Sequence, residues 1–376
     1  MKSRICDLLG IEFPLFAFTH CRDVAAAVSK AGGLGVFGGA KIGAEQLKIE
    51  LDWIDAHVDG KPYGVDLAIP ESMPTKGETQ QDSATLYASI PEKHKRFVAD
   101  LLTRHGVNPE SPVPADEPRP LSPFLDEAEK MVDESLRHPI RLIVNALGRP
   151  PKFMIDKAHQ AKVPVGALVG SKEHAIKNLD AGVDVLIAQG TEAAAHCGEV
   201  STMVLVPEIV RAVEGIRPVP VLAAGGIVTG RQMAAAMVMG AAGAWTGSVW
   251  LTTVESDVPS VVRDKLLAAR SQDTLRSRAM TGKTARQLRT AWSDAWEGPD
   301  SPGALPMPFQ HLLTDRAFQQ ATKAAETGNK KAAAVVSEGV GQGIGMIDTV
   351  KSCRAVVLEF MEDFAEALER TRELSE

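Results

Sequence analysis

The chain has 376 residues, of which 44% are hydrophobic and 24% are charged, and its formal net charge at pH 7 is −7. These values are typical of a soluble globular protein. The negative charge argues against nucleic acid or an anionic membrane surface as a partner, and we expect neither a signal peptide nor a membrane span.

The four cysteines, at positions 6, 21, 197 and 353, show no metal-type spacing. We interpret them as free thiols in a reducing compartment, which predicts a cytoplasmic protein without a metal site. Cys197 follows His196 directly, so a Cys/His nucleophile is an alternative. Adjacent side chains usually point apart, however, and this argues against that alternative.

Short apolar runs alternate with amphipathic segments from the start of the chain. They predict strands at 13–18, 33–37 and 63–69, and helices at 23–31 and 44–57. Gly33, Gly35 and Gly38 form a G-x-G-x-x-G pattern. We reject a dinucleotide fingerprint here, because the pattern follows a predicted helix and is itself the strand.

The alternation fails between about residues 70 and 123, which are rich in Pro, Ser, Glu and Asp and contain a predicted helix at 91–105. A long interruption of this kind is usually functional or mobile. We interpret it as an insertion above the third strand, either a lid over the site or a surface excursion.

Regular alternation returns at Phe124. The pattern predicts strands at 140–145, 163–168, 183–188, 219–223 and 242–246, and helices at 124–137, 151–161, 172–181, 204–214 and 229–239. Eight strand-then-helix units are the count and order of a (β/α)8 TIM barrel. A doubly wound open sheet is the alternative, but short and evenly spaced strands favour closure.

The last third of the chain has a helical pattern. We predict helices at 258–271, 284–296, 315–327, 330–340 and 348–372, with a Pro- and Gly-rich linker at 296–309. The predicted organisation is therefore a barrel over residues 1–256, carrying the insertion at about 70–123, and a C-terminal helical cap over 257–376 that packs on the barrel.

The segment 183–202, VDVLIAQGTEAAAHCGEVST, joins a buried strand to a loop of small residues that ends in His196. Small side chains allow the backbone to approach a flat or anionic ligand closely. The imidazole lies at the carboxyl end of a parallel strand, where barrels carry their chemistry. His196 is therefore a candidate base, and a structural loop histidine is the alternative.

Two glycine clusters follow the seventh and eighth predicted strands. The first contains Gly225 and Gly226, and the second contains Gly247 and Ser248. Loops at these two positions form the recurrent phosphate site of barrel enzymes. The pattern predicts a phosphate-bearing ligand, with ordinary tight turns as the alternative. The absence of a Walker A pattern argues against a nucleoside triphosphatase.

Several segments together resemble the nitronate monooxygenase family, formerly called 2-nitropropane dioxygenases. They are AQGTEAAAHCGE (188–199), PVLAAGGI (220–227), GAAGAWTGSVWLTTVES (240–256), AAAVSKAGGLGVFGG (25–39), KPYGVDL (61–67) and TGKTARQLRTAW (281–292). The resemblance covers most of the chain outside the insertion. It implies a TIM barrel that binds FMN non-covalently.

The resemblance also assigns site residues. His196 matches the family's active-site histidine, and the flavin phosphate is expected on the two glycine clusters. The remaining residues expected at the flavin are Ala17, Phe18, Thr19, Asp66, Gln189, Ala194 and Ala195. An isoalloxazine needs a flat pocket of backbone and small side chains with one titrating group against the substrate.

This chain departs from the family pattern at three places. Ala17 to His20 stand where the family usually ends its first strand in Ala-Pro-Met, which makes His20 a second candidate catalytic imidazole. Asp66 stands at the family's usual Asn, and Ala194 and Ala195 at its glycines. A carboxylate near the flavin would disfavour the anionic reduced flavin unless it is paired. The departures indicate a divergent branch.

We therefore expect an FMN-dependent oxidoreductase that oxidises an alkyl nitronate with O2 to a carbonyl compound and nitrite. The alternative is an NAD(P)H-dependent flavin reductase of an enoyl or acyl-CoA thioester or a quinone. A barrel that binds FMN or phosphate without catalysis is a third hypothesis. The expected partners are a small-molecule substrate and O2 or NAD(P)H, and a homodimer is compatible with the sequence.

Overall fold

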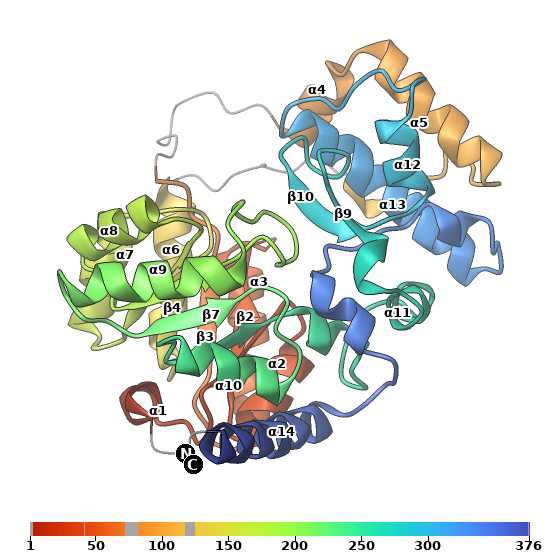
Figure 1. The fold of residues 1–376 in the computed structure, drawn as a ribbon. Coiled ribbons are helices and arrows are strands. Elements are labelled where there is room, and N and C mark those ends of the chain that lie inside the picture. Colours follow the sequence, from red (N-terminus) through yellow and green to blue (C-terminus); the bar gives the residue numbers. More distant parts are fainter. Residues whose placement is uncertain (1–2, 41, 72–81, 117–124, 375) are drawn as a thin grey trace.

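Eight parallel strands close into a barrel in the order of the sequence in the computed structural model, which describes residues 3–40, 42–71, 82–116, 125–374 and 376 (Figure 1). They are β1 (Leu15–Thr19), β2 (Leu34–Gly38), β3 (Gly64–Leu67), β4 (Leu142–Asn145), β5 (Val165–Val169), β6 (Val185–Gln189), β7 (Val221–Ala224) and β8 (Gly243–Thr246). β8 pairs with β1, so the sheet has no free edge. This closure confirms the TIM barrel.

Amphipathic helices surround the barrel and connect successive strands. They are α2 (Arg22–Lys30), α3 (Ala44–His57), α6 (Leu125–Arg137), α7 (Lys152–Gln160), α8 (Lys172–Ala181), α9 (Thr202–Glu214) and α10 (Gly230–Val238). Only a short 3-10 helix, η2 (Ser248–Thr252), follows β8 directly. The long C-terminal helix α14 (Cys353–Glu373) packs against α10 and α2 and covers this part of the ring (Figure 1).

The barrel is filled by side chains that alternate along each strand, as expected for a small closed barrel. The interior cluster includes Phe16, Leu34, Leu142 and Trp245. Helix α1 (Arg4–Leu9) adds Ile5, Cys6 and Leu9 to the same cluster and therefore closes the amino-terminal end of the barrel. The opposite end, where the strands finish, is the mouth of the barrel.

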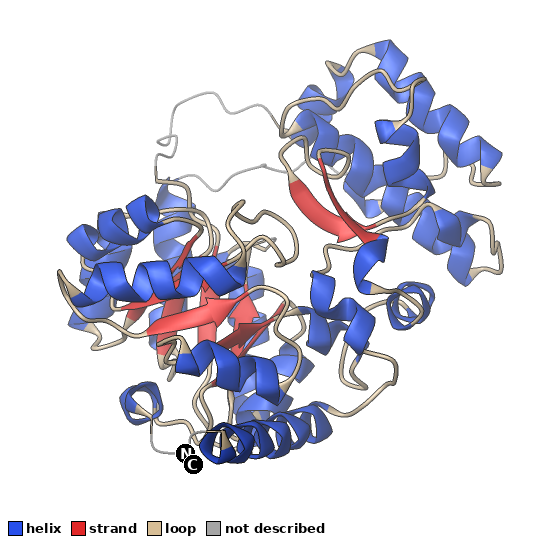
Figure 2. Ribbon diagram, viewed as in Figure 1, coloured by secondary structure: helices blue, strands red, loops and turns tan. Residues whose placement is uncertain are grey.

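A second body, the cap, lies beside the barrel (Figure 2). Its core combines part of the insertion with part of the C-terminal segment, because residues from Ile90 to Val107 and from Val262 to Ile344 share one hydrophobic cluster. Its elements are α4 (Ser83–Ala88), α5 (Glu92–Arg104), η1 (Pro114–Asp116), α11 (Ser260–Leu267), η3 (Ser271–Asp273), β9 (Thr274–Ser277), β10 (Ala285–Leu288), α12 (Ala291–Glu297), α13 (Phe309–Glu326), η4 (Ala332–Ala334) and η5 (Gln342–Met346).

Two predicted helices in the last third are wrong. The segment 284–296 begins as strand β10, which pairs with β9, and becomes helical only at Ala291. The segment 330–340 contains one 3-10 turn, η4. In both places pairing and packing with distant residues override local propensity. Part of the predicted insertion, residues 72–81 and 117–123, lies outside the described residues.

Candidate active site

The parallel strands bring most of the predicted site residues to the mouth of the barrel. They follow or end five strands: Phe18, Thr19 and His20 at β1, Asp66 at β3, Gln189, Ala194, Ala195 and His196 at β6, Gly225 and Gly226 at β7, and Gly247 and Ser248 at β8. Ala17 differs from these residues. Its side chain is fully buried in the cluster between strands and helices, so only its backbone is near the mouth.

The His196 loop is held by the cap. Ala195 has a φ of 54° and exchanges two backbone hydrogen bonds with Arg286 of β10, at 2.9 and 2.8 Å. The Nδ1 of His196 lies 3.2 Å from the carbonyl oxygen of Thr284, which can only accept, so Nδ1 carries the proton. In the neutral ring the lone pair is then on Nε2, the nitrogen that a general base uses.

Two arginines support this loop, and neither was a predicted site residue. The Nε and Nη2 of Arg286 donate to the carbonyl oxygen of Thr191 at 3.0 and 2.9 Å. Arg276, its partner across the hairpin, donates from Nη1 to the hydroxyl of Thr191 at 3.3 Å. The sequence signal for Arg286 was its place in the resembling segment 281–292, since nothing local indicated its contact with a loop some 90 residues earlier.

His20 lies at the same mouth, where it follows β1 and contacts β2. Its Nδ1 donates to the carbonyl oxygen of Gly38 at 2.7 Å, and its ring stands edge-on to Phe18 at 5.2 Å. A Cβ at Gly38 would lie 2.8 Å from this Nδ1, so the bare backbone is needed there. Phe18 in turn stacks on Trp245 of β8, at 6.2 Å.

Asp66 is the most unusual polar residue at the mouth. It is 2% exposed, and neither carboxyl oxygen has a hydrogen-bond partner among the described residues. Burial raises the pKa of this carboxyl to about 8. Buried polar groups are nearly always paired in folded proteins, so an orphaned carboxyl here points to a ligand that would complete it.

The two glycine clusters have different surroundings. Gly225 (φ 115°) and Gly226 (φ 70°) adopt left-handed conformations, and a Cβ at Gly225 would lie 2.6 Å from the hydroxyl of Thr202. A Cβ at Gly247 would meet no atom within 4 Å. Gly225 therefore has a packing reason to be glycine, whereas Gly247 borders open space that a ligand group can occupy.

Ser248 is linked to a segment that we call the strap, residues 339–346, in which every second residue is glycine. The backbone N–H of Gly341 donates to Ser248 Oγ at 2.9 Å, and that of Gln342 donates to the carbonyl oxygen of Glu192 at 2.9 Å. A Cβ at Gly343 would lie 2.7 Å from the carbonyl oxygen of Gly226. The strap therefore packs directly on the loops after β6, β7 and β8.

Cys197 is unsuited to act as a nucleophile. Its thiol is partly buried and lies 3.4 Å from the carbonyl oxygen of Thr191. Burial raises the pKa of the thiol, which disfavours the thiolate that a nucleophilic cysteine needs. Among the described residues no cluster of His, Cys, Asp or Glu could hold a metal ion, and no helix is long and apolar enough to cross a membrane.

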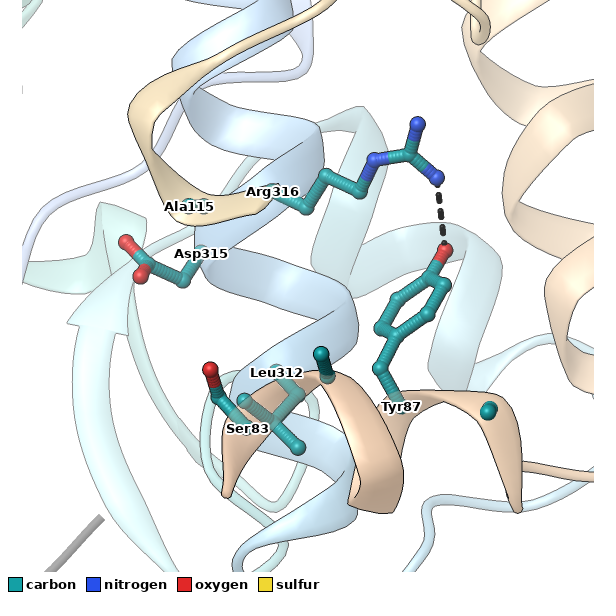
Figure 3. Close-up of a pocket in the computed structure, with 8 residues that line it drawn as sticks. Ser83, Tyr87, Ala115, Leu312, Asp315 and Arg316 are labelled. Atoms are coloured by element: carbon teal, nitrogen blue, oxygen red, sulfur yellow. Dashed lines mark hydrogen bonds between the residues drawn. The ribbon is translucent and has the colours of Figure 1, made fainter. Parts of the chain in front are cut away.

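A cavity of about 150 Å³ lies inside the cap, between α4, η1 and α13 (Figure 3). Arg316 donates to the hydroxyl of Tyr87 there at 3.0 Å, and Ser83 and Asp315 face the same space. This cavity contains no predicted site residue. Its volume is below the 300–1,000 Å³ typical of ligand pockets, so it does not suit a flavin.

Comparison with known proteins places this geometry in a family. A model described as nitronate monooxygenase matches residues 2–363. The chain belongs to the nitronate monooxygenase family. It is therefore a flavin-dependent oxidoreductase that acts on a small-molecule substrate.

Individual relatives and solved structures match most or all of the chain. The putative monooxygenase Rv1533 of Mycobacterium tuberculosis is 48% identical over 98% of both chains. A probable nitronate monooxygenase of Staphylococcus saprophyticus is 30% identical over 88% of this chain and 89% of its own. Nitroalkane oxidase from Streptomyces ansochromogenes (25% identity, TM-score 0.76) covers 98% of this chain and 100% of its own, and FabK from Thermotoga maritima (26%, 0.72) covers 100% and 99%.

The mouth of the barrel has donors and acceptors that suit a flavin. Neither carboxyl oxygen of Asp66 has a hydrogen-bond partner among the described residues, and a flavin ring carries heteroatoms along its edge. The backbone at Gly226 and Gly247 carries no side chain that would obstruct a phosphate. These residues fit the cofactor that the nitronate monooxygenase family implies.

Proposed function

We propose that this protein is an FMN-dependent oxidoreductase that oxidises an alkyl nitronate with O2 to a carbonyl compound and nitrite. The observation that carries the proposal is His196. It is exposed at the mouth with its Nδ1 proton held by the Thr284 carbonyl, in a chain that the nitronate monooxygenase model matches almost throughout. Bound FMN would supply the two-electron acceptor for the substrate and the site of reoxidation by O2.

The chain's own residues have separate roles in this proposal. The lone pair on His196 Nε2 takes the Cα proton of a neutral nitroalkane, and the resulting imidazolium donates to the nitronate oxygens. His20 is the second imidazole at the mouth. The phosphate lies on Gly225, Gly226, Gly247 and Ser248, and the remaining flavin contacts come from Ala17, Phe18, Thr19, Asp66, Gln189, Ala194 and Ala195.

The likeness to FabK supports a second candidate, because it equals the likeness to nitroalkane oxidase in identity and coverage. In this candidate the protein is an NAD(P)H-dependent flavin reductase of an enoyl or acyl-CoA thioester or a quinone. The cap, which contacts the His196 loop through β10, would then help to hold a larger substrate.

One anaerobic experiment separates the two candidates. The purified protein, reconstituted with FMN if it is colourless, is mixed first with an alkyl nitronate and then, in a second cuvette, with NADH or NADPH. Bleaching of the flavin bands by the nitronate alone supports the first candidate, and bleaching by the nicotinamide alone supports the second. Failure to bind FMN at all would overturn both.

The same preparation tests the remaining expectations. We expect O2 or NAD(P)H as the second reactant, and size-exclusion chromatography with light scattering would show whether the protein is a homodimer. Fractionation of cells that express it would test the expected cytoplasmic location.

A further inference from the structure

Asp66 lies inside the barrel, close to its mouth. It is paired in register with Gly38 of β2 and Val144 of β4. Side chains alternate along a strand, and Gly64, two residues earlier, faces Val36 and Leu142 of the barrel interior. Asp66 therefore points inward, one layer above these apolar side chains.

The fold satisfies a neighbouring polar side chain at the same end of the barrel but leaves Asp66 unsatisfied. Asn145, on the adjacent strand β4, accepts from the N–H of Ile69 at 2.9 Å and donates to the carbonyl oxygen of Ile69 at 3.0 Å. Asp66 is equally buried, yet both of its oxygens lack a partner in the described part of the chain. In the described part of the chain only the backbone N–H of Ala146 acts on this carboxyl and lowers its pKa, and that N–H already donates to the carbonyl oxygen of Leu67 at 2.8 Å, so these residues do not account for the polarity of Asp66.

No charged group among the described residues neutralises an ionised Asp66. Strands β2 and β4, which flank it, contain no titratable side chain. The titratable groups in the loops after β1, β3 and β4 have other contacts. His20 Nδ1 donates to the carbonyl oxygen of Gly38, and Glu71 forms an ion pair with Arg149 at the surface. Among the described residues Asp66 forms no ion pair, so the free protein favours its uncharged form.

We propose that Asp66 binds the flavin ring as an uncharged carboxylic acid, donating its proton to a ring heteroatom, so that FMN affinity depends on pH through this one side chain. The inference rests on the proposed FMN site. A neutral carboxyl presents one donor and one acceptor, as an Asn amide does, whereas a carboxylate only accepts. Ionised Asp66 would oppose the lone pairs of the flavin oxygens and nitrogens.

The direction of the pH dependence follows from linkage. Because burial raises the pKa of Asp66 to about 8, the free protein keeps the proton below that pH and loses it above. FMN binds the protonated form, so its affinity is constant below about pH 7.5 and falls at higher pH. We expect the FMN dissociation constant to rise about tenfold between pH 7 and pH 9.

Quenching of FMN fluorescence by the apoprotein tests the proposal between pH 6.5 and pH 9.5. Asp66→Asn keeps a donor at every pH and should bind FMN with the wild-type affinity at pH 6.5 and without the fall at high pH. Asp66→Ala should bind about tenfold more weakly than the wild type at pH 6.5 and show no such fall. Ionisation of the flavin itself would appear equally in all three proteins and serves as the baseline.

A pH-independent affinity in the wild type, or the same fall in Asp66→Asn, would overturn the role of Asp66 but leave the FMN site intact. If the protein binds no FMN at any pH, both the proposed function and this inference are overturned. If the variants fold poorly, calorimetry of the wild type alone decides. FMN binding at pH 9 in buffers of different ionisation enthalpy should take up a proton, and release of a proton or no exchange contradicts the proposal.

Discussion

His196 is a single residue on which the proposed chemistry depends. Its Nδ1 contact with the Thr284 carbonyl could be kept by an amide, while the Nε2 lone pair would be lost. His196→Asn should therefore retain FMN and slow flavin reduction by a neutral nitroalkane by at least about 100-fold, the usual size of a general-base contribution. Stopped-flow absorbance measures this rate, with exposed His174→Asn on α8 as control. A near-wild-type rate would show that His196 is not the general base and would leave His20 as the candidate.

Gly247 tests the position of the phosphate. Because no atom lies within 4 Å of a Cβ built there, Gly247→Val should fold normally but fill the space that we assign to the phosphate. We expect FMN affinity to fall at least about tenfold. Gly215→Val, at the end of α9 with its nearest atom 3.8 Å away, is the matched control. Equal FMN affinity in both variants would place the phosphate elsewhere.

The buried carboxyl of Asp66 should also make the stability of the apoprotein depend on pH. Its pKa is about 8 in the folded protein, against the ordinary aspartate value of 3.8, so between these pH values the folded state holds a proton that the unfolded chain has lost. Stability then falls as the pH rises through this window. Urea unfolding should show Asp66→Asn more stable than the wild type at pH 7.5, by up to a few kcal/mol, and less so at pH 5. A constant difference would mean that Asp66 does not titrate.

The extent to which the site could be predicted varies from residue to residue. His196, Gly226 and Gly247 follow apolar runs that mark strand ends, so a linear pattern was enough to gather them at one mouth. The direction of the Ala17 side chain depends on one-residue register, which composition does not specify. Arg286 reaches Thr191 only through tertiary structure, and no spacing in the sequence encodes that distance.

The strap is an element whose role depends on its glycines. An added methyl group at Gly343 would lie 2.7 Å from the Gly226 carbonyl oxygen and from a methyl carbon of Val228. Gly343→Ala should therefore destabilise the protein by about 1–3 kcal/mol through overpacking and weaken FMN binding. Gly339→Ala, whose Cβ would be 3.6 Å from that of Ala195, should be nearly neutral. Equal urea midpoints for the two variants would contradict this packing role.

The elements of the barrel were easier to predict than those of the cap. A parallel strand buried on both faces is a short apolar run, and all eight were found within about two residues of their ends. Strands β9 and β10 are instead Arg-containing segments that pair with each other and with the His196 loop. Their strand character comes from that pairing, which local sequence does not show.

A single cut at the predicted boundary, after residue 256, would damage both bodies of the molecule. A fragment of residues 1–256 lacks α14, which covers α2 and α10, and leaves α5 without the C-terminal half of its hydrophobic cluster. We expect this fragment to aggregate or to unfold without a cooperative transition. A fragment of residues 1–347 keeps the cap and should be more soluble, though still less stable than the full chain. Cooperative melting and FMN binding by 1–256 would instead establish it as an independent domain.

The interleaving of barrel and cap also bears on the order in which the protein can fold during synthesis. The apolar face of α5, with Val98, Leu101 and Leu102, leaves the ribosome long before its partners Leu313 and Ala317 are made. Chains are made at roughly 5–20 residues per second, so this face stays uncovered for at least about ten seconds. During this interval the nascent chain exposes an apolar surface to which a chaperone can bind. Mutations in α13 that weaken its packing on α5 should therefore lower the yield of folded protein by a larger factor than they lower the stability of the folded chain.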